Sequence, residues 1–156
     1  MSIEKIVSGG QTGVDRGALD AALERGFPCG GWCPPGCLAE DGPIGGAYPL
    51  RELDHGGYAE RTARNVLDAD GTAIIYFSEL AGGTELTLRR CIEHGKPYAL
   101  VDAGEVTPTR AAEMIGEFAA AHGIATLNVA GPRASEAPPA HAYAREAVGL
   151  VLDALA

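Results

Sequence analysis

The segment IEKIVSGGQTGVDRGALDAALERG, residues 3–26, indicates the fold class of this protein. Its first part, 3–8, is short, apolar and rich in β-branched residues, which is typical of a buried strand. A glycine-rich loop follows at 9–13. From 14 to 25, apolar residues recur at helical spacing until Gly26 ends the helix. A strand, a loop and a helix in this order are typical of an α/β protein.

The same alternation of strands and helices continues along the chain. Strands alternating with helices form a parallel sheet that carries helices on both faces. We therefore predict one domain, residues 1–156, of the α/β class, with a doubly wound, mostly parallel sheet of about five strands. The further predicted strands are 29–33, 72–77, 97–101 and 124–129, and the further predicted helices are 58–66, 84–94, 108–122 and 140–155.

Composition and charge narrow the possible functions. With 46% hydrophobic and 21% charged residues, the composition is that of an ordinary globular domain and argues against intrinsic disorder. No apolar run reaches the 18 residues of a membrane-spanning helix, and the N-terminus lacks a signal-peptide pattern, so we expect a cytoplasmic protein without a membrane partner. The net charge of −9 and the lack of a basic cluster argue against nucleic acid. A single phosphate or oxyanion is still compatible, because backbone N–H groups bind anions without cations.

Four cysteines occur, at 29, 33, 37 and 91. A cytosolic chain of this length has little need of disulfides, so we expect free thiols. The spacing C-x3-C-x3-C of the first three is not a common zinc pattern, and a structural metal site is the lesser alternative.

The strand-to-helix loops of the predicted sheet are long and unusual. Right-handed crossovers bring these loops to one edge of the sheet, where open α/β sheets bind ligands. They comprise 9–13, 34–57 and 78–84. Loops as long as 34–57 are usually functional or disordered, and its scattered hydrophobic residues favour packing. We predict that 34–57 is a lid or wall over a site, with a mobile insertion as the alternative.

The first glycine loop has the layout of a phosphate cradle, because it joins a strand to the start of a helix. Glycine permits positive φ and lets the backbone approach an anion closely, and the helix start offers free N–H groups. The glycine spacing matches neither G-x-G-x-x-G nor a P-loop, and a plain tight turn is the alternative interpretation. The candidate ligand-binding residues in this loop are Gly9, Gly10, Gln11, Thr12 and Gly13.

Asp15 and Arg16 open the helix that follows. An acid in the first turn suits the helix dipole, which is a structural explanation for Asp15. The functional alternative is that Arg16 neutralises a bound anion or that Asp15 binds a ligand hydroxyl.

A second glycine pair, Gly82-Gly83, stands between the strand 72–77 and its helix, followed by Thr84 and Glu85. Thr84 is a good N-cap residue, so simple capping would explain the motif. Its position at the same sheet edge as the first glycine loop instead favours a second ligand contact. Glu85 is either a catalytic carboxylate or a first-turn acid.

Arg61 and Asn65 are four residues apart and share one face of the helix 58–66, with Thr62 beside them. This polar set either faces solvent or holds a bound oxyanion through charge-assisted hydrogen bonds.

Five motifs belong together: GGQTGVDR at 9–16, GWCP at 31–34, AEDGPI at 39–44, Arg61-Thr62 with Asn65-Val66, and GGTE at 82–85. As a set they resemble the molybdenum carrier family, and they add Trp32 to the candidate ligand-binding residues. The family is similar in fold to a larger Rossmann-like group that senses or processes nucleotide-derived ligands, including cytokinin-activating phosphoribohydrolases. Those enzymes use a Gly-Gly-x-Gly-Thr-x-x-Glu loop. The corresponding loop of this chain, at 82–85, is shorter.

The resemblance implies a Rossmann-like carrier that binds and shelters molybdenum cofactor (molybdopterin), or molybdate, as a small anionic ligand. It also leads us to expect a homo-oligomer, dimer or tetramer. Cys33 and Cys37 are further candidate contacts for a soft metal centre. The alternatives are a phosphoribohydrolase-like enzyme acting on a nucleotide, a nucleotide-ligand sensor and a passive structural domain. Because no nucleophile–base pair stands out, we favour a binding protein and assign no catalytic and no metal-ligating residue.

Overall fold

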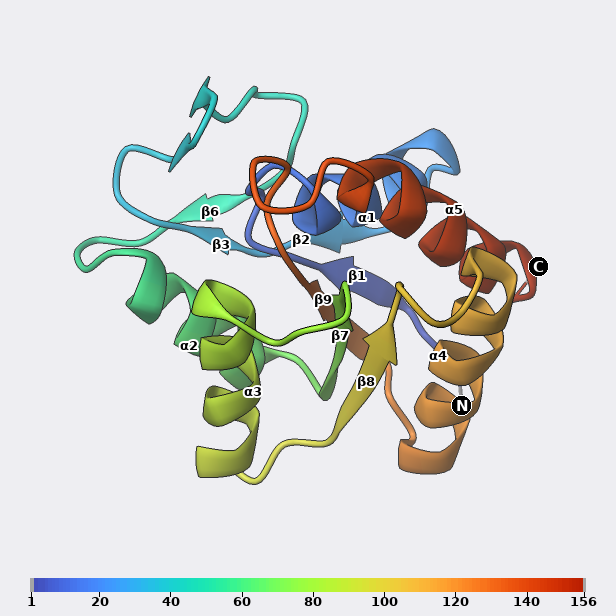
Figure 1. Ribbon diagram of the computed structural model, residues 1–156. Helices are drawn as coiled ribbons and strands as arrows, with labels where there is room; N and C mark the ends of the chain where they lie inside the picture. Colours follow the sequence, from blue (N-terminus) through green and yellow to red (C-terminus); the bar gives the residue numbers. More distant parts are fainter. Residues whose placement is uncertain (1, 156) are drawn as a thin grey trace.

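A five-stranded, all-parallel sheet with the strand order β2-β1-β9-β7-β8 forms the centre of the computed structural model, which describes residues 2–155 (Figure 1). The last strand in the chain, β9, lies between β1 and β7. This architecture confirms the predicted α/β fold. The strands of the sheet are β1 (Lys5–Val7), β2 (Cys29–Gly30), β7 (Gly71–Tyr76), β8 (Tyr98–Asp102) and β9 (Thr126–Ala130).

Five helices cover the two faces of the sheet (Figure 1). Three of them, α1, α4 and α5, pack on one face, and α2 and α3 pack on the other. None of the helices in the described part of the chain is long and apolar enough to cross a membrane. The helices are α1 (Val14–Glu24), α2 (Tyr58–Asp68), α3 (Gly82–Glu93), α4 (Pro108–His122) and α5 (Ala140–Asp153).

The central strand β7 is apolar on both sides because both of its faces are covered. Its successive side chains point to opposite faces of the sheet. Ile75 joins the large core beneath α1, α4 and α5, whereas Ile74 packs with Val66 of α2 and Cys91 of α3.

The predicted strand 29–33 is interrupted at Gly31. Its φ is +132°, and a Cβ at this position would lie 2.0 Å from the carbonyl oxygen of Ser8. The chain therefore leaves the central sheet after β2. Trp32–Cys33 forms a separate strand, β3, which pairs in parallel with β6 (Arg51–Glu52). The prediction of one continuous strand was wrong here, because close contact with β1 turns the backbone away.

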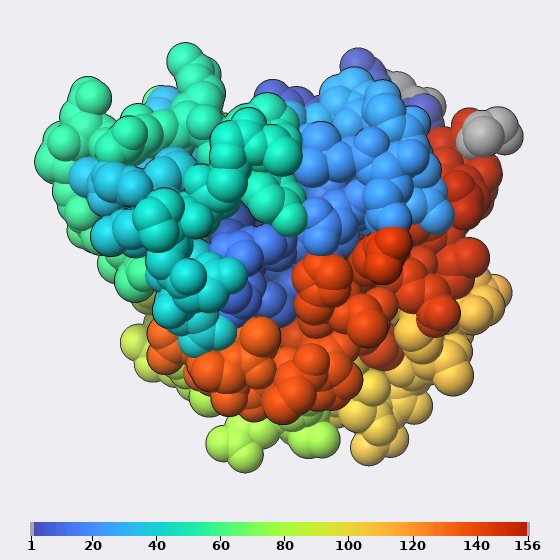
Figure 2. Space-filling view, turned by 90° about the horizontal axis from the view of Figure 1, so that it is seen from above, coloured from blue at the N-terminus to red at the C-terminus, as the bar shows by residue number. Residues whose placement is uncertain are grey.

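Segment 34–57 contains a short antiparallel hairpin, formed by β4 (Leu38–Ala39) and β5 (Gly42–Pro43). Viewed from above in Figure 2, this cyan and teal segment lies on one side of the blue N-terminal loop, and the orange-red stretch that follows β9 lies on the other. Leu50 and Ile44 pack over the first glycine loop, where a Cβ on Gly10 would lie 2.4 Å from Leu50 Cδ1.

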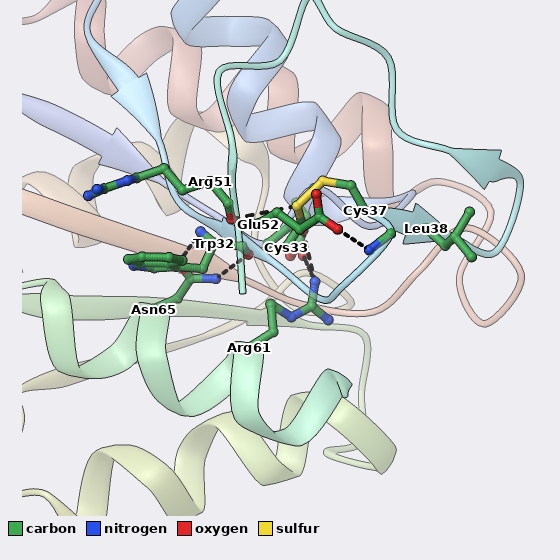
Figure 3. Close-up of a disulfide and its surroundings, with 12 residues drawn as sticks. Trp32, Cys33, Cys37, Leu38, Arg51, Glu52, Arg61 and Asn65 are labelled. Atoms are coloured by element: carbon green, nitrogen blue, oxygen red, sulfur yellow. Dashed lines mark hydrogen bonds and ion pairs between the residues drawn. A yellow bond between two sulfur atoms is a disulfide. The ribbon is translucent and has the colours of Figure 1, made fainter. Parts of the chain in front are cut away.

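Cys33 and Cys37 form a disulfide (Figure 3), so the prediction of four free thiols was wrong for this pair. A tight turn brings their Cα atoms to 5.1 Å, within the range that a disulfide spans. In this turn Cys37 N donates to Pro34 O at 2.8 Å and Gly36 has a φ of +84°. Both sulfurs are thereby unavailable to a metal, while Cys29 and Cys91 are free.

Thiol titration tests this pairing. In denaturant without reductant we expect about two reactive thiols per chain, from Cys29 and Cys91, and four after reduction. Native protein should react slowly at neutral pH, because burial raises the pKa of both free thiols. Cys37→Ser is the matched control and should release Cys33 as a third thiol. Four reactive thiols in unreduced, unfolded protein would contradict the disulfide.

Candidate ligand-binding site

A cavity of about 270 Å³ opens at the carboxyl edge of the sheet, where β1, β9 and β7 end. The connection that follows β1 leads to β2 on one side, and the connection that follows β7 leads to β8 on the other. Open α/β sheets bind ligands where connections diverge in this way. The cavity brings together residues from the first glycine loop, α1, α2 and α3. Of the residues that the sequence indicated, it is lined by Gly9, Gln11, Asp15, Arg61, Thr62, Asn65, Gly82, Gly83 and Thr84.

Three N–H groups in the first glycine loop and at the start of α1 already have acceptors within the protein. Gln11 N donates to Asp15 Oδ2 at 3.4 Å, and Thr12 N donates to Gln11 Oε1 at 3.0 Å. Val14 N donates to Pro132 O at 3.1 Å. The start of α1 therefore has few donors left for an anion, and it already carries the carboxylate of Asp15. The geometry favours the tight-turn interpretation over a phosphate cradle at this loop.

Gly13 is required for packing rather than for access to a ligand. Its φ is +81°, and a Cβ would lie 2.3 Å from the carbonyl oxygen of Pro132. This contact holds the stretch after β9 against the start of α1. Gly13 and Gly10 both lie outside the cavity lining.

The start of α3 has the free donors that α1 lacks. The helix begins at Gly82, and its N-cap residue Ala81 offers no side-chain cap, so the alternative interpretation of Thr84 as a simple N-cap does not hold. The first helical hydrogen bond runs from Glu85 N to Ala81 O at 3.2 Å. Among the described residues, the N–H groups of 82–84 have no such acceptor. They line the cavity at the positive end of the helix dipole.

Arg61 crosses from α2 to the first glycine loop and is only 9% exposed (Figure 3). Its Nη1 donates to Gly9 O at 2.9 Å and lies 3.9 Å from Asp15 Oδ2. Within residues 2–155, Nε and Nη2 of Arg61 make no hydrogen bond to the protein. Arg61 therefore does not face solvent, and part of its guanidinium is available to a ligand in the cavity that it lines.

Asp15 is 7% exposed and lines the same cavity. Burial raises the pKa of its carboxyl group, and the nearby Arg61 charge and the hydrogen bond from Gln11 only partly oppose this. Asp15 is therefore a buried carboxylate that faces the cavity, rather than merely a first-turn acid of a helix.

Asn65 holds the backbone of Trp32, as Figure 3 shows. Its Oδ1 accepts from Trp32 N at 2.8 Å, and its Nδ2 donates to Trp32 O at 3.1 Å. The Trp32 ring points away from the cavity, into a separate hollow that is also lined by Arg51 and Arg64. The structure thus places Trp32 outside the cavity, while Asn65 links it to the cavity wall.

Arg16 and Thr12 anchor segment 34–57 instead of lining the cavity. Arg16 Nη1 pairs with Asp41 Oδ2 at 2.6 Å, and its Nε donates to Gly10 O at 3.3 Å. The hydroxyl of Thr12 donates to Glu40. The positive charge of Arg16 is therefore matched by Asp41, which removes the support for Arg16 as the neutraliser of a ligand.

Some cavity residues were missed by the sequence analysis. Asn128 is 3% exposed, and its Nδ2 donates to Thr72 Oγ1 at 3.2 Å. The sequence did contain a signal for Asn128, because it is a polar residue within the apolar strand TLNVA. Arg133 and Glu136, an ion pair at 3.3 Å, follow β9 in a stretch that no motif marked. The cavity is also lined by Tyr58, Leu86, Thr87, Val129, Ala130 and Gly131.

The comparisons with known proteins agree with this fold. A crystal structure from Syntrophus aciditrophicus, named "Putative molybdenum carrier protein", superposes with a TM-score of 0.94 and 41% sequence identity, covering 97% of this chain and 96% of that one. No curated protein matches. The profile of the circularly permutated YpsA SLOG family matches residues 6–152. With nearly the whole length matched, this chain belongs to the circularly permutated YpsA SLOG family.

Proposed function

We propose that this protein is a carrier that binds a small phosphate-bearing or oxyanion ligand in the cavity, with molybdenum cofactor as the favoured cargo. The observation that carries the proposal is Arg61, a buried cation with unused donors beside the free N–H groups of 82–84. A guanidinium and a helix N-terminus are together well suited to a phosphate group. The name of the similar protein from Syntrophus aciditrophicus supports the carrier role.

The donor set fits the phosphate of such a cargo better than its metal. No cysteine lines the cavity, and Cys33 and Cys37 are joined to each other. The molybdenum would therefore be held through the organic part of the cofactor, while Arg61 and the start of α3 would hold the phosphate.

Segment 34–57 is proposed as the wall or lid of this site. It is fixed beside the first glycine loop by the contacts of Asp41 with Arg16 and of Glu40 with Thr12. A further anchor is Tyr48, whose hydroxyl donates to Asp20 Oδ1 of α1 at 2.6 Å. We also propose a cytoplasmic location, as the sequence led us to expect, and a dimer or tetramer on the strength of the resemblance.

A hydrolase acting on a nucleotide is the second candidate, and the position of Glu85 argues against it. Glu85 lies outside the cavity lining, and its carboxylate accepts from Arg89 Nη2 at 2.7 Å on the helix surface. It behaves as a first-turn acid of α3 with an i, i+4 partner.

Thermal shift with simple anions tests the proposed site. We expect millimolar phosphate, sulfate and molybdate to raise the melting temperature, because a ligand that binds only the folded state stabilises it by RT ln(1 + [L]/Kd). Chloride at the same ionic strength is the control for screening. If none of the three oxyanions raises the melting temperature above the chloride control, the anion site at Arg61 and 82–84 is refuted.

A further inference from the structure

We infer that Cys33 and Cys37 are a reversible redox pair, which fixes one side of the cavity when it is oxidised and frees it when it is reduced. The proposed cytoplasmic location is the first reason. The cytosol keeps thiols reduced, and a disulfide found in a cytosolic protein is usually transient or redox-sensing. The inference goes beyond the proposed carrier role, and no part of it depends on which ligand the cavity takes.

The disulfide contributes little to the stability of the whole chain. It closes a very short ring, because the two cysteines are four positions apart in the sequence. A disulfide stabilises a protein mainly by restricting the unfolded chain, and this effect grows with the length of the loop that is closed. The core beneath α1, α4 and α5 already supplies the burial that a domain of this size needs. The role of the pair is therefore local.

The disulfide holds Cys37 in a backbone conformation that is unfavourable without it (Figure 3). The φ of Cys37 is +49°, in the left-handed region that disfavours residues with a Cβ. Leu38, the next residue, is 49% exposed, so packing holds it only weakly. Cys33 is firmly placed, since it is fully buried in β3 and its carbonyl oxygen accepts from Leu53 N at 3.0 Å. Reduction would therefore release Cys37 and leave Cys33 in place.

Two hydrogen bonds connect the releasable end of the pair to the cavity and to the cover of the first glycine loop. Tyr58 lines the cavity, and its hydroxyl donates to Leu38 O at 3.3 Å. The Tyr58 ring lies 5.3 Å from Arg61 Cζ. Ile44 N donates to Cys37 O at 2.8 Å, and the Ile44 side chain packs over the first glycine loop. Movement of Cys37 would therefore loosen both contacts.

Cys37 is the sulfur that an external thiol can reach, because it is partly exposed whereas Cys33 is fully buried. A small thiol such as glutathione is the reductant. Its thiolate attacks Cys37 Sγ, the sulfur–sulfur bond breaks, and Cys33 leaves as a thiolate that takes up a proton. A second thiol then attacks the mixed disulfide and releases Cys37. Two external thiols thereby become one external disulfide, and the protein pair gains two electrons and two protons.

The fold has a place for the reduced form of the buried cysteine. Cys33 Sγ lies 3.6 Å from Arg51 O, which is within reach of a thiol donor. A buried thiol at this position would therefore have an acceptor. Reoxidation is the reverse exchange, in which the Cys33 thiolate attacks the mixed disulfide on Cys37 and expels the external thiol.

Hydrogen exchange of the full chain, followed by mass spectrometry, tests the coupling without a ligand. We expect amides within 34–44 to exchange roughly 30-fold faster after reduction, the factor that loop-closure entropy gives for so short a ring. Helix α4 should be unchanged and is the internal control. Cys37→Ser should exchange like reduced protein and ignore the reductant. Cys29→Ser leaves the pair intact and should respond as the wild type does.

Glutathione redox buffers test reversibility. We expect thiol counts on acid-quenched, unfolded samples to pass from two to four per chain in a single two-electron step, and to return when oxidised glutathione is restored. Equal exchange of 34–44 in the two forms refutes the switch. A pair that stays fully oxidised or fully reduced in every buffer refutes it too. Neither readout involves a ligand, so the proposed anion site stands or fails separately.

Discussion

Arg61→Ala is expected to weaken phosphate binding roughly 10- to 150-fold, because a hydrogen bond to a charged group contributes about 1.5–3 kcal/mol and each 1.4 kcal/mol is tenfold. The guanidinium is the one cation that reaches from α2 into the cavity beside the start of α3. Calorimetry with inorganic phosphate measures this loss directly.

The same substitution is also expected to destabilise the fold, which the sequence did not predict. Because Arg61 is 9% exposed, its removal leaves Gly9 O without its donor and the buried carboxylate of Asp15 without its counter-charge. Breaking a buried ion pair from one side costs about 3 kcal/mol or more. A domain of ordinary stability would still be folded at 25 °C, so urea unfolding and binding can both be measured.

Arg64→Ala is the matched control for Arg61→Ala. It removes a guanidinium from the same helix, but Arg64 lies over the Trp32 ring, has a 47% exposed side chain and pairs with Asp68 at the surface. We expect little change in phosphate affinity and a small change in stability. Equal, small effects of the two substitutions on affinity would show that the anion site does not extend to α2.

Gly13→Ala is expected to cost several kcal/mol of unfolding free energy, the largest stability effect in the first glycine loop. A φ of +81° is strained for any residue with a Cβ, by about 1–3 kcal/mol. The added Cβ would also lie 2.3 Å from Pro132 O and 2.8 Å from Arg133 C, and overpacking of this kind costs about 1–3 kcal/mol more. Both neighbours are backbone atoms, which cannot rotate away.

Gly83→Ala is the control, since it places the same methyl group in the other glycine motif. No atom lies within 4 Å of a Cβ at Gly83, and its backbone is helical without a positive φ. Alanine is a better helix former than glycine, so we expect unchanged or slightly higher stability. Urea denaturation of both variants gives the comparison. A Gly13→Ala protein within about 1 kcal/mol of wild type would mean that the stretch after β9 is not held at this glycine.

The sequence alone predicted the helices, the strands of the central sheet and the edge of the sheet at which the cavity opens, but not the short strands β3 to β6 outside that sheet. Alternating short apolar runs and helical periodicities are local properties, so β7, α4 and α5 could be read from the residues that form them. The i, i+4 spacing of Arg61 and Asn65 likewise placed both on one helix face, and both are buried on that face. The glycine motifs identified the two loops that meet at the cavity.

Only the tertiary structure decided which of the two glycine loops has free donors. Both loops precede a helix and both contain a glycine pair, so they look alike in sequence. At the first loop, the N–H groups of Gln11, Thr12 and Val14 donate to Asp15, to the Gln11 side chain and to Pro132, and Pro132 comes from a distant part of the chain. At the second loop no such partner arrives among the described residues, so the N–H groups of 82–84 are available.

The strand order and the burial of charges were likewise decided by long-range packing. The sequence predicted a strand at 124–129, and the structure has it at 126–130 as β9. Its place between β1 and β7 depends on which apolar faces meet in three dimensions, and this place brings Asn128 and Arg133 to the cavity. The sequence left open whether Arg61 faces solvent or a ligand, because charged side chains are usually solvated. It is buried because its guanidinium contacts Gly9 O and Asp15, which are some fifty residues away in sequence.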